Sequence, residues 1–218
     1  VLTAGDDGLA RIWGISIDEP GATTLSAGFD LEDREGRLTS AAFSPDGKRI
    51  LTAGSDGLAR LWDGRTGAAL ADLDGHVAQI NSAAFSPDGA RVATAASDGA
   101  VRIWDVSTTP PGEPIALNAH GESTYQADFS PDGSLLVTTG CDEQNDPCQA
   151  ASARVWDTET GELLIEWFID QAGITSASLS PDGQHLLTIG DDGLVQLMRI
   201  YLDAEAMRDG ADDRLNRG

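Results

Sequence analysis

The stretch INSAAFSPDGARVATAASDGAVRIWD, which runs from Ile80 to Asp105, carries the pattern that decides the fold. Its Ser-Pro-Asp-Gly segment is a turn in which proline presets φ and glycine accepts a positive φ. A second turn, Ser97-Asp98-Gly99, has the Asp-Gly pair of tight β-hairpins. The pattern predicts three short strands, over Ile80–Phe85, Arg91–Ala95 and Ala100–Trp104, and a weaker fourth strand near Pro114–Leu117.

The same unit recurs along the chain. Ser-Pro-Asp-Gly starts at positions 44, 86, 130 and 180, so the units are 42, 44 and 50 residues apart. A second mark closes the third strand of each unit. These marks are Ile12-Trp13-Gly14, Leu61-Trp62-Asp63, Ile103-Trp104-Asp105, Val155-Trp156-Asp157 and the divergent Leu197-Met198-Arg199. A period of this length, with short strands between turns, indicates a repeat protein built from small sheets.

On these turns and tryptophans, the chain resembles the WD-repeat β-propeller family over residues 1 to about 200. The resemblance implies an all-β fold, a β-propeller of four-stranded antiparallel blades. We expect about five blades and 18 strands, with the first and last blades incomplete. The expected units are 1–37, 38–79, 80–123, 124–173 and 174–200, followed by a short helical tail over 201–218.

An open arc of blades would leave strand edges unpaired. We therefore expect upstream blades in a longer, bacterial multidomain protein. The alternative is a closed ring of five blades with imperfect ends.

Each blade of the family contains a hydrogen-bonded structural set of histidine, serine or threonine, aspartate and tryptophan. Carried over by register, the complete set here is His76, Thr94, Asp98 and Trp104. Partial sets are Thr52, Asp56 and Trp62, and His120, Thr138 and Trp156. A buried tryptophan N–H and a buried carboxylate both need partners, which such a set supplies. Because the threonine lies in mid-strand and the set recurs, we expect a structural role and no catalytic residues, cofactor or metal.

The hairpin after Thr138 is longer than its counterparts. Thr138 and Trp156 are 18 residues apart, against 10 for Thr94 and Trp104, so eight residues are inserted. Loop insertions in repeat proteins often gather on a binding face. We hypothesise that the acidic insert contacts a partner through Asp142, Glu143 and Asp146. Cys141 and Cys148 form a disulfide there or remain free thiols, and a tolerated insertion without a partner is the alternative.

A second group of candidate contact residues stands just before the hairpin aspartates. These residues are Asp6, Ser55, Ser97 and Asp191. In the propeller that the resemblance implies, they ring the mouth of the central channel. We expect them to contact a protein partner on that face; the alternative is that they serve only as turn residues.

The net charge of −22 limits the partners. An acidic surface repels phosphate backbones, so we expect no nucleic-acid partner. It favours basic proteins, or it reflects adaptation of a whole proteome to high salt. No apolar run reaches the length of a membrane helix, so no membrane partner is expected. Two cysteines in 218 residues favour a cytoplasmic location.

These features predict a non-catalytic platform for protein–protein interaction, with partners on the propeller face or rim. It would form the sensor end of a larger bacterial signalling protein. A purely structural propeller domain is the first alternative. A propeller enzyme is the second, although the sequence has no nucleophile elbow, phosphate-binding loop or His/carboxylate metal cluster.

Overall fold

The computed structural model describes residues 1–19, 22–32, 36–143, 150–170 and 173–200. These residues form 18 strands in five antiparallel sheets of 3, 4, 4, 4 and 3 strands. The number of strands and the incomplete first and last sheets are therefore confirmed. The predicted helix over 201–218 lies outside the described residues. In the part of the chain that is described, no helix is long and apolar enough to cross a membrane.

Each sheet is a meander in which consecutive strands pair. The first contains β1 (Leu2–Ala4), β2 (Leu9–Glu19) and β3 (Ala22–Glu32), and the second β4 (Leu38–Phe43), β5 (Arg49–Gly54), β6 (Ala59–Asp63) and β7 (Ala69–Leu73). The third contains β8 (Ile80–Phe85), β9 (Arg91–Ala96), β10 (Ala100–Asp105) and β11 (Ile115–Asn118). The fourth contains β12 (Ser123–Phe129), β13 (Leu135–Cys141), β14 (Ala150–Asp157) and β15 (Leu163–Asp170), and the fifth β16 (Ile174–Leu179), β17 (His185–Gly190) and β18 (Val195–Arg199).

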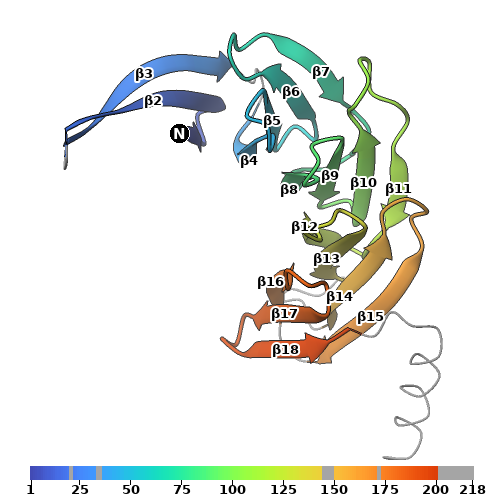
Figure 1. The fold of residues 1–218 in the computed structure, drawn as a ribbon. Helices are drawn as coiled ribbons and strands as arrows, with labels where there is room; N and C mark the ends of the chain where they lie inside the picture. The colour runs from blue at the N-terminus through green and yellow to red at the C-terminus, as the bar shows by residue number, and fades with distance from the viewer. Residues whose placement is uncertain (20–21, 33–35, 144–149, 171–172, 201–218) are drawn as a thin grey trace, which may run out of the picture.

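The five sheets stand side by side along an open, curved arc (Figure 1). Strands β4, β8, β12 and β16 lie on its concave side, and β7, β11 and β15 on its convex side. Because the strands of a meander alternate in direction, every Ser-Pro-Asp-Gly turn lies at one end of its sheet. The hairpins β1–β2, β5–β6, β9–β10, β13–β14 and β17–β18 lie at the opposite end, which we call the hairpin face.

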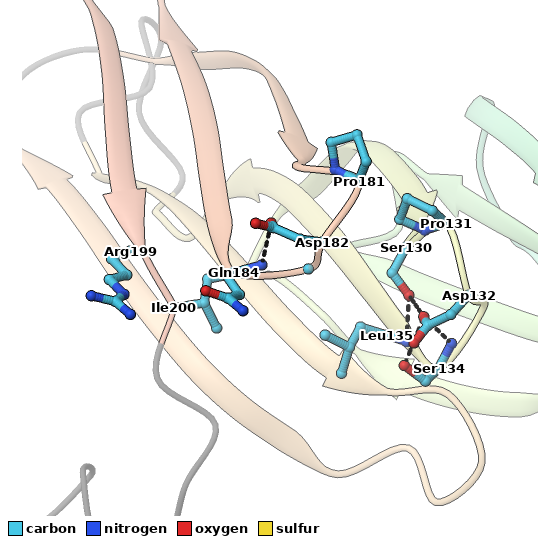
Figure 2. A pocket seen from close by; sticks show the side chains of 11 residues that line it. Ser130, Pro131, Asp132, Ser134, Leu135, Pro181, Asp182, Gln184, Arg199 and Ile200 are labelled. Atoms are coloured by element: carbon cyan, nitrogen blue, oxygen red, sulfur yellow. Dashed lines mark hydrogen bonds between the residues drawn. The ribbon is translucent and has the colours of Figure 1, made fainter.

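The Ser-Pro-Asp-Gly turn is held by its own side chains, as Figure 2 shows for the turn at Ser130. The Ser130 hydroxyl accepts a hydrogen bond from the Leu135 amide at 2.9 Å, and the Asp132 carboxylate accepts one from the Ser134 amide at 3.0 Å. Gly133 has a φ of 75°, a left-handed conformation that glycine adopts without steric penalty. These bonds reverse the chain within a few residues and bring the second strand back beside the first.

The hydrophobic core lies between neighbouring sheets. Ala53 and Ala59, on the middle strands of the second sheet, are fully buried, and their small side chains let the next sheet approach. In the same cluster Leu51 packs with Val92 and Trp104 of the third sheet. Burial of apolar area at about 25 cal/mol per Å² is the main stabilising term for such a stack.

Polar side chains near the concave edge also link neighbouring sheets directly. The links are Thr39 Oγ1 to the Ile80 carbonyl (2.6 Å), Asn81 Nδ2 to the Thr124 carbonyl (2.8 Å) and the Ala177 amide to Gln126 Oε1 (3.1 Å). Each joins the first strand of one sheet to the first strand of the next. They are additional to the hydrogen bonds within the sheets.

Candidate functional site

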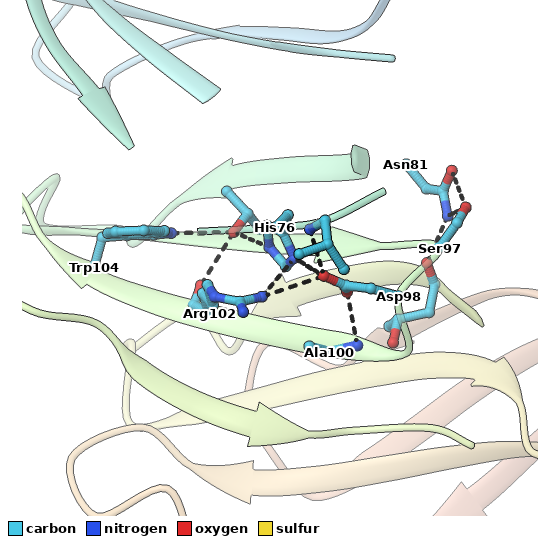
Figure 3. Close-up of polar contacts among 10 residues, drawn as sticks. His76, Asn81, Ser97, Asp98, Ala100, Arg102 and Trp104 are labelled. Atoms are coloured by element: carbon cyan, nitrogen blue, oxygen red, sulfur yellow. Dashed lines mark hydrogen bonds and ion pairs between the residues drawn. The ribbon is translucent and has the colours of Figure 1, made fainter. Parts of the chain in front are cut away.

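His76, Thr94, Asp98 and Trp104 form one continuous hydrogen-bonded chain in the third sheet (Figure 3). The indole Nε1 of Trp104 donates to Thr94 Oγ1 at 3.0 Å, and Thr94 Oγ1 lies 2.8 Å from His76 Nε2. His76 Nδ1 lies 2.9 Å from Asp98 Oδ2. Arg102 Nη1 also lies 2.7 Å from Nδ1. In the tautomer that donates from Nδ1 to the carboxylate, Nε2 accepts from the threonine hydroxyl.

Burial decides the charge of these groups. The His76 side chain is fully buried, and loss of solvent lowers its pKa more than the Asp98 hydrogen bond raises it. Burial also disfavours ionisation of Asp98. Hydrogen bonds from His76 and from the Ala100 and Val77 amides outweigh that effect and keep the pKa of Asp98 below its ordinary value. The imidazole is therefore neutral near pH 7, and the threonine that it contacts is buried away from any substrate.

A second chain of the same kind lies in the fourth sheet. Trp156 Nε1 donates to Thr138 Oγ1 at 3.0 Å, and His120 Nε2 lies 3.1 Å from the same hydroxyl. His120 is fully buried, and desolvation lowers its pKa.

The aspartate of this second set is Asp142, which the sequence analysis placed in a partner-contacting loop. Its carboxylate accepts the Ser152 hydroxyl and lies 2.8 Å from Arg154 Nη1 and 3.5 Å from His120 Nδ1. The side chain is only 15% exposed, so the carboxylate faces inward and is satisfied within the sheet. Burial by itself would raise the pKa of Asp142. Contacts with His120, Ser152 and Arg154 lower it by more, so the pKa lies well below its ordinary value.

A signal for Asp142 was present in the sequence. Asp56, Asp98 and Asp142 each follow the strand threonine of their unit by four residues. The eight-residue insertion separates Asp142 from any Asp-Gly pair, and a search for that pair therefore missed it.

The second sheet has part of the set. Trp62 Nε1 donates to Thr52 Oγ1 at 2.9 Å. Asp56 pairs with Arg60 at 2.9 Å, as Asp98 pairs with Arg102 in the third sheet at 3.5 Å. The residue at the histidine position of this unit, Arg34, lies outside the described residues.

The four residues predicted at the channel mouth all lie at hairpin turns and are exposed. They are Asp6, Ser55, Ser97 and Asp191. Arg37, directly before β4, links the first two, because its Nε lies 3.0 Å from Asp6 Oδ1 and its amide donates to Ser55 Oγ at 2.9 Å. Asn81 Nδ2 donates to Ser97 Oγ at 3.0 Å. The structure thus brings these residues to the hairpin face.

Val77 is a hairpin-face residue that the sequence analysis missed. It follows His76 directly, and its amide donates to Asp98 Oδ2 at 3.1 Å, so the backbone is held in place. Its side chain is nevertheless 89% exposed. An apolar side chain next to a histidine of the structural set, in a loop that leads to a first strand, is the pattern that could have identified it.

The inserted hairpin β13–β14 is only partly described. Glu143, two residues after the end of β13, is exposed, whereas Asp146 and Cys148 lie outside the described residues. Cys141 is 1% exposed and disulfide-bonded, and Cys148 is the only other cysteine of the chain. Among the residues that the structure describes, no three His, Cys, Asp or Glu side chains are grouped so that they could hold a metal ion.

Meander sheets arranged around an arc, with a buried tryptophan bonded to a buried threonine in each of the second, third and fourth sheets, define a β-propeller-type repeat protein. Comparison of the sequence with protein families gives the particular family. Residues 29–63, 67–105, 113–145 and 164–197 match the WD domain, G-beta repeat family, and these segments make up more than half of the chain. The chain belongs to the WD-repeat family, whose domains mediate protein–protein interactions.

Two curated proteins share part of this sequence. The chain is 32% identical over 72 residues, 33% of its length, to the eukaryotic translation initiation factor 3 subunit I of Phaeosphaeria nodorum. It is 31% identical over 85 residues, 39% of its length, to the protein HIR1 of Candida albicans. The matched segments cover 19% and 8% of those proteins, so the chain spans a small part of each.

Proposed function

We propose that this chain is a non-catalytic platform whose hairpin face binds a protein partner. The observation that carries the proposal is that some polar side chains near that face are buried in internal hydrogen bonds, whereas others are exposed to solvent. The histidines and aspartates of the structural sets are buried in internal contacts, while Asp6, which also pairs with Arg37, and Val77, Glu143 and Asp191 are exposed at the hairpin face. A rigid base with exposed polar and apolar side chains suits recognition better than chemistry.

A basic partner fits this face best. The chain carries a net charge of −22, and the hairpins add exposed carboxylates at Asp6, Glu143 and Asp191. Complementary charge speeds association and fixes the orientation of the partner, and salt screens it. The partner is proposed to be a protein and not a nucleic acid, because the same carboxylates repel phosphates.

Charge reversal on this face tests the proposal. The variant D6K/E143K/D191K is compared with E113K/E159K/E162K, which makes the same change of charge at exposed positions of the opposite end. Partners captured by the unaltered chain are identified by mass spectrometry, purified and measured by calorimetry. We expect at least about tenfold weaker binding for the hairpin-face variant and a smaller effect for the control.

Two results would count against this function. Equal loss in both variants would mean that overall charge, not the hairpin face, attracts the partner. Saturable binding that neither variant changes would place the contact elsewhere. A purely structural domain would show no specific partner at all.

The wider setting is also a proposal. We propose that the platform is the binding end of a larger bacterial signalling protein, which the genomic sequence around this segment would test. Its location is proposed to be cytoplasmic. The disulfide at Cys141 argues for an oxidising compartment instead, so alkylation of intact cells before lysis, with and without reductant, decides between the two.

A further inference from the structure

Two arginines clamp neighbouring sheets together at the end opposite the hairpin face. Arg49 of the second sheet donates from Nη1 to the Val106 carbonyl at 2.7 Å and from Nη2 to the Gly89 carbonyl at 2.5 Å. Its guanidinium carbon lies 5.5 Å from the centre of the Phe85 ring. All three partners belong to the third sheet or the chain directly after β10.

Arg91 repeats this arrangement one sheet further along. It donates to the Thr158 carbonyl at 3.1 Å and to the Gly133 carbonyl at 2.8 Å, and lies 5.8 Å from the Phe129 ring. The two glycines hold the same place in the Ser-Pro-Asp-Gly turn, and Val106 and Thr158 each directly follow the Trp-Asp pair. A guanidinium site is therefore a recurrent feature of these interfaces.

The corresponding residue at the next interface is Leu135. Arg49, Arg91 and Leu135 each stand five residues after the serine of their turn, and each amide donates to that serine hydroxyl at 2.9 Å. The register is thus fixed by hydrogen bonds as well as by sequence. Position 135 therefore brings no guanidinium to the interface between the fourth and fifth sheets, where Arg199, from the end of β18, is the arginine that lies nearby.

A pocket of about 390 Å³ lies at this place (Figure 2). Leu135, Gly183 and Ile200 line it, and the last two are the counterparts of Gly89 and Val106. No described residue donates a hydrogen bond to the Gly183 or Ile200 carbonyl, the two acceptors that a guanidinium takes at the other interfaces.

The pocket wall favours a cation with an apolar stem. Asp132 and Asp182 line it, and hydrogen bonds from Ser130 and Ser180, with backbone amides, lower the pKa of both carboxyls. Leu135 and Ile200 supply apolar surface for the stem of a long side chain.

Two substitutions weaken the site relative to its counterparts. Leu179 replaces the phenylalanine of the other interfaces, and Arg199 stands where they have aspartate. The affinity must therefore come from the carbonyls and the two carboxylates.

We propose that this pocket binds an arginine side chain of a partner protein, in the place that Arg49 and Arg91 fill at the other interfaces. The guanidinium would donate to the Gly183 and Ile200 carbonyls. The inference goes beyond the hairpin-face function, because the pocket lies at the opposite end of the sheets. The strongly acidic chain favours a partner that brings the arginine.

The probe is the peptide acetyl-Gly-Arg-Gly-amide, titrated into the full chain by NMR or calorimetry, with acetyl-Gly-Lys-Gly-amide for comparison. We expect saturable binding of one arginine peptide per chain, about tenfold tighter than the lysine peptide, because only a planar guanidinium reaches both carbonyls. Leu135→Arg should abolish it by filling the site from within. Leu135→Phe blocks the site without a charge and serves if the arginine variant does not fold.

Arg91→Leu provides a matched gain of function. It removes the guanidinium from a neighbouring interface, so the stoichiometry should rise from one peptide to two. The D6K/E143K/D191K variant should leave peptide binding unchanged, which separates this inference from the proposed function.

Three outcomes would overturn the proposal. One is no saturable binding, or binding that Leu135→Arg and Leu135→Phe leave intact. The second is equal affinity for both peptides, which indicates general attraction to the acidic surface. The third is binding that emerges only after Arg208, Arg214 and Arg217 are changed to glutamine, which would make the chain's own arginines the occupants.

Discussion

Trp104 takes part in two kinds of interaction at once. Its ring packs in the core between the second and third sheets, and its N–H is satisfied by Thr94 in the interior. The same pairing occurs at Trp62 with Thr52 and at Trp156 with Thr138. A buried indole N–H without an acceptor would destabilise the folded chain by about 1–3 kcal/mol, so the threonine is as necessary to the arrangement as the ring.

Replacing Trp104 by alanine should destabilise the chain by about 3–5 kcal/mol, because a large buried side chain is lost and a cavity remains. Trp167→Ala, on the outer strand β15 where the ring is only half-buried, should have a smaller effect. Urea unfolding curves measure both. A change of less than about 1 kcal/mol for Trp104→Ala would contradict the burial described here.

The buried histidines make stability depend on pH. Desolvation lowers the pKa of His76 and His120 in the folded state below the ordinary value for histidine, about 6.5. Below about pH 6.5 the unfolded chain takes up protons that the folded chain does not, so the free energy of unfolding decreases as the pH is lowered. The pKa values of Asp98 and Asp142 are also lowered in the folded state, so below about pH 4 the unfolded chain binds protons more readily and further stability is lost.

Thermal melts between pH 8 and pH 5 check this expectation. The unfolding temperature should be level above about pH 7 and decline below about pH 6.5. The double variant H76Q/H120Q should show a flatter profile, whereas H185Q, at a half-exposed position, should follow the unaltered chain. Parallel profiles for all three proteins would show that the buried imidazoles do not cause the decline.

At the level of strands and sheets, the repeated turns carried most of the predictive information. Ser-Pro-Asp-Gly and the closing tryptophan mark the ends of strands, so the sheets of 3, 4, 4, 4 and 3 strands could be counted without coordinates. The role of Asp142 could not be obtained from the Asp-Gly turn, because the insertion removed that turn. The arginine clamps depend on contacts between residues 40 to 67 positions apart, which periodicity alone does not show.

The inserted hairpin offers a test of Asp142 against its neighbour. Asp142→Asn removes the charge that faces Arg154 and His120, and should destabilise the fourth sheet by about 1.5–3 kcal/mol, the range for hydrogen bonds to charged groups. Glu143→Gln, at the next residue, which is exposed, should change stability by less than about 0.5 kcal/mol. Urea unfolding of both variants compares them, and equal effects would place Asp142 on the surface.

For the whole molecule, the fifth sheet differs from the other sheets mainly in the exposure of apolar side chains on one of its faces. Leu197 and Val195 are 68% and 61% exposed, whereas their counterparts Leu61 and Ala59, in the second sheet, are 3% and 0% exposed. The face has the composition of a buried interface but meets no further sheet in the described residues. Contiguous exposed apolar surface of this kind promotes association.

The isolated chain should therefore self-associate as its concentration rises. Added salt should strengthen the association, because it screens the repulsion between chains of charge −22. Sedimentation velocity should show that Leu197→Glu suppresses it, while Leu163→Glu, at an exposed position of β15, does not. A monomer at all concentrations would show that this face is not adhesive.

The polar links among β4, β8, β12 and β16 have a mechanical consequence. They tie neighbouring sheets at the concave edge, through Thr39, Asn81 and Gln126. A load that straightens or tightens the arc would therefore rotate each sheet about that edge, and the spacing of the outer strands would change first. A ligand that inserts between two outer strands would therefore change the curvature of the arc, while the linked strands β4, β8, β12 and β16 keep their spacing.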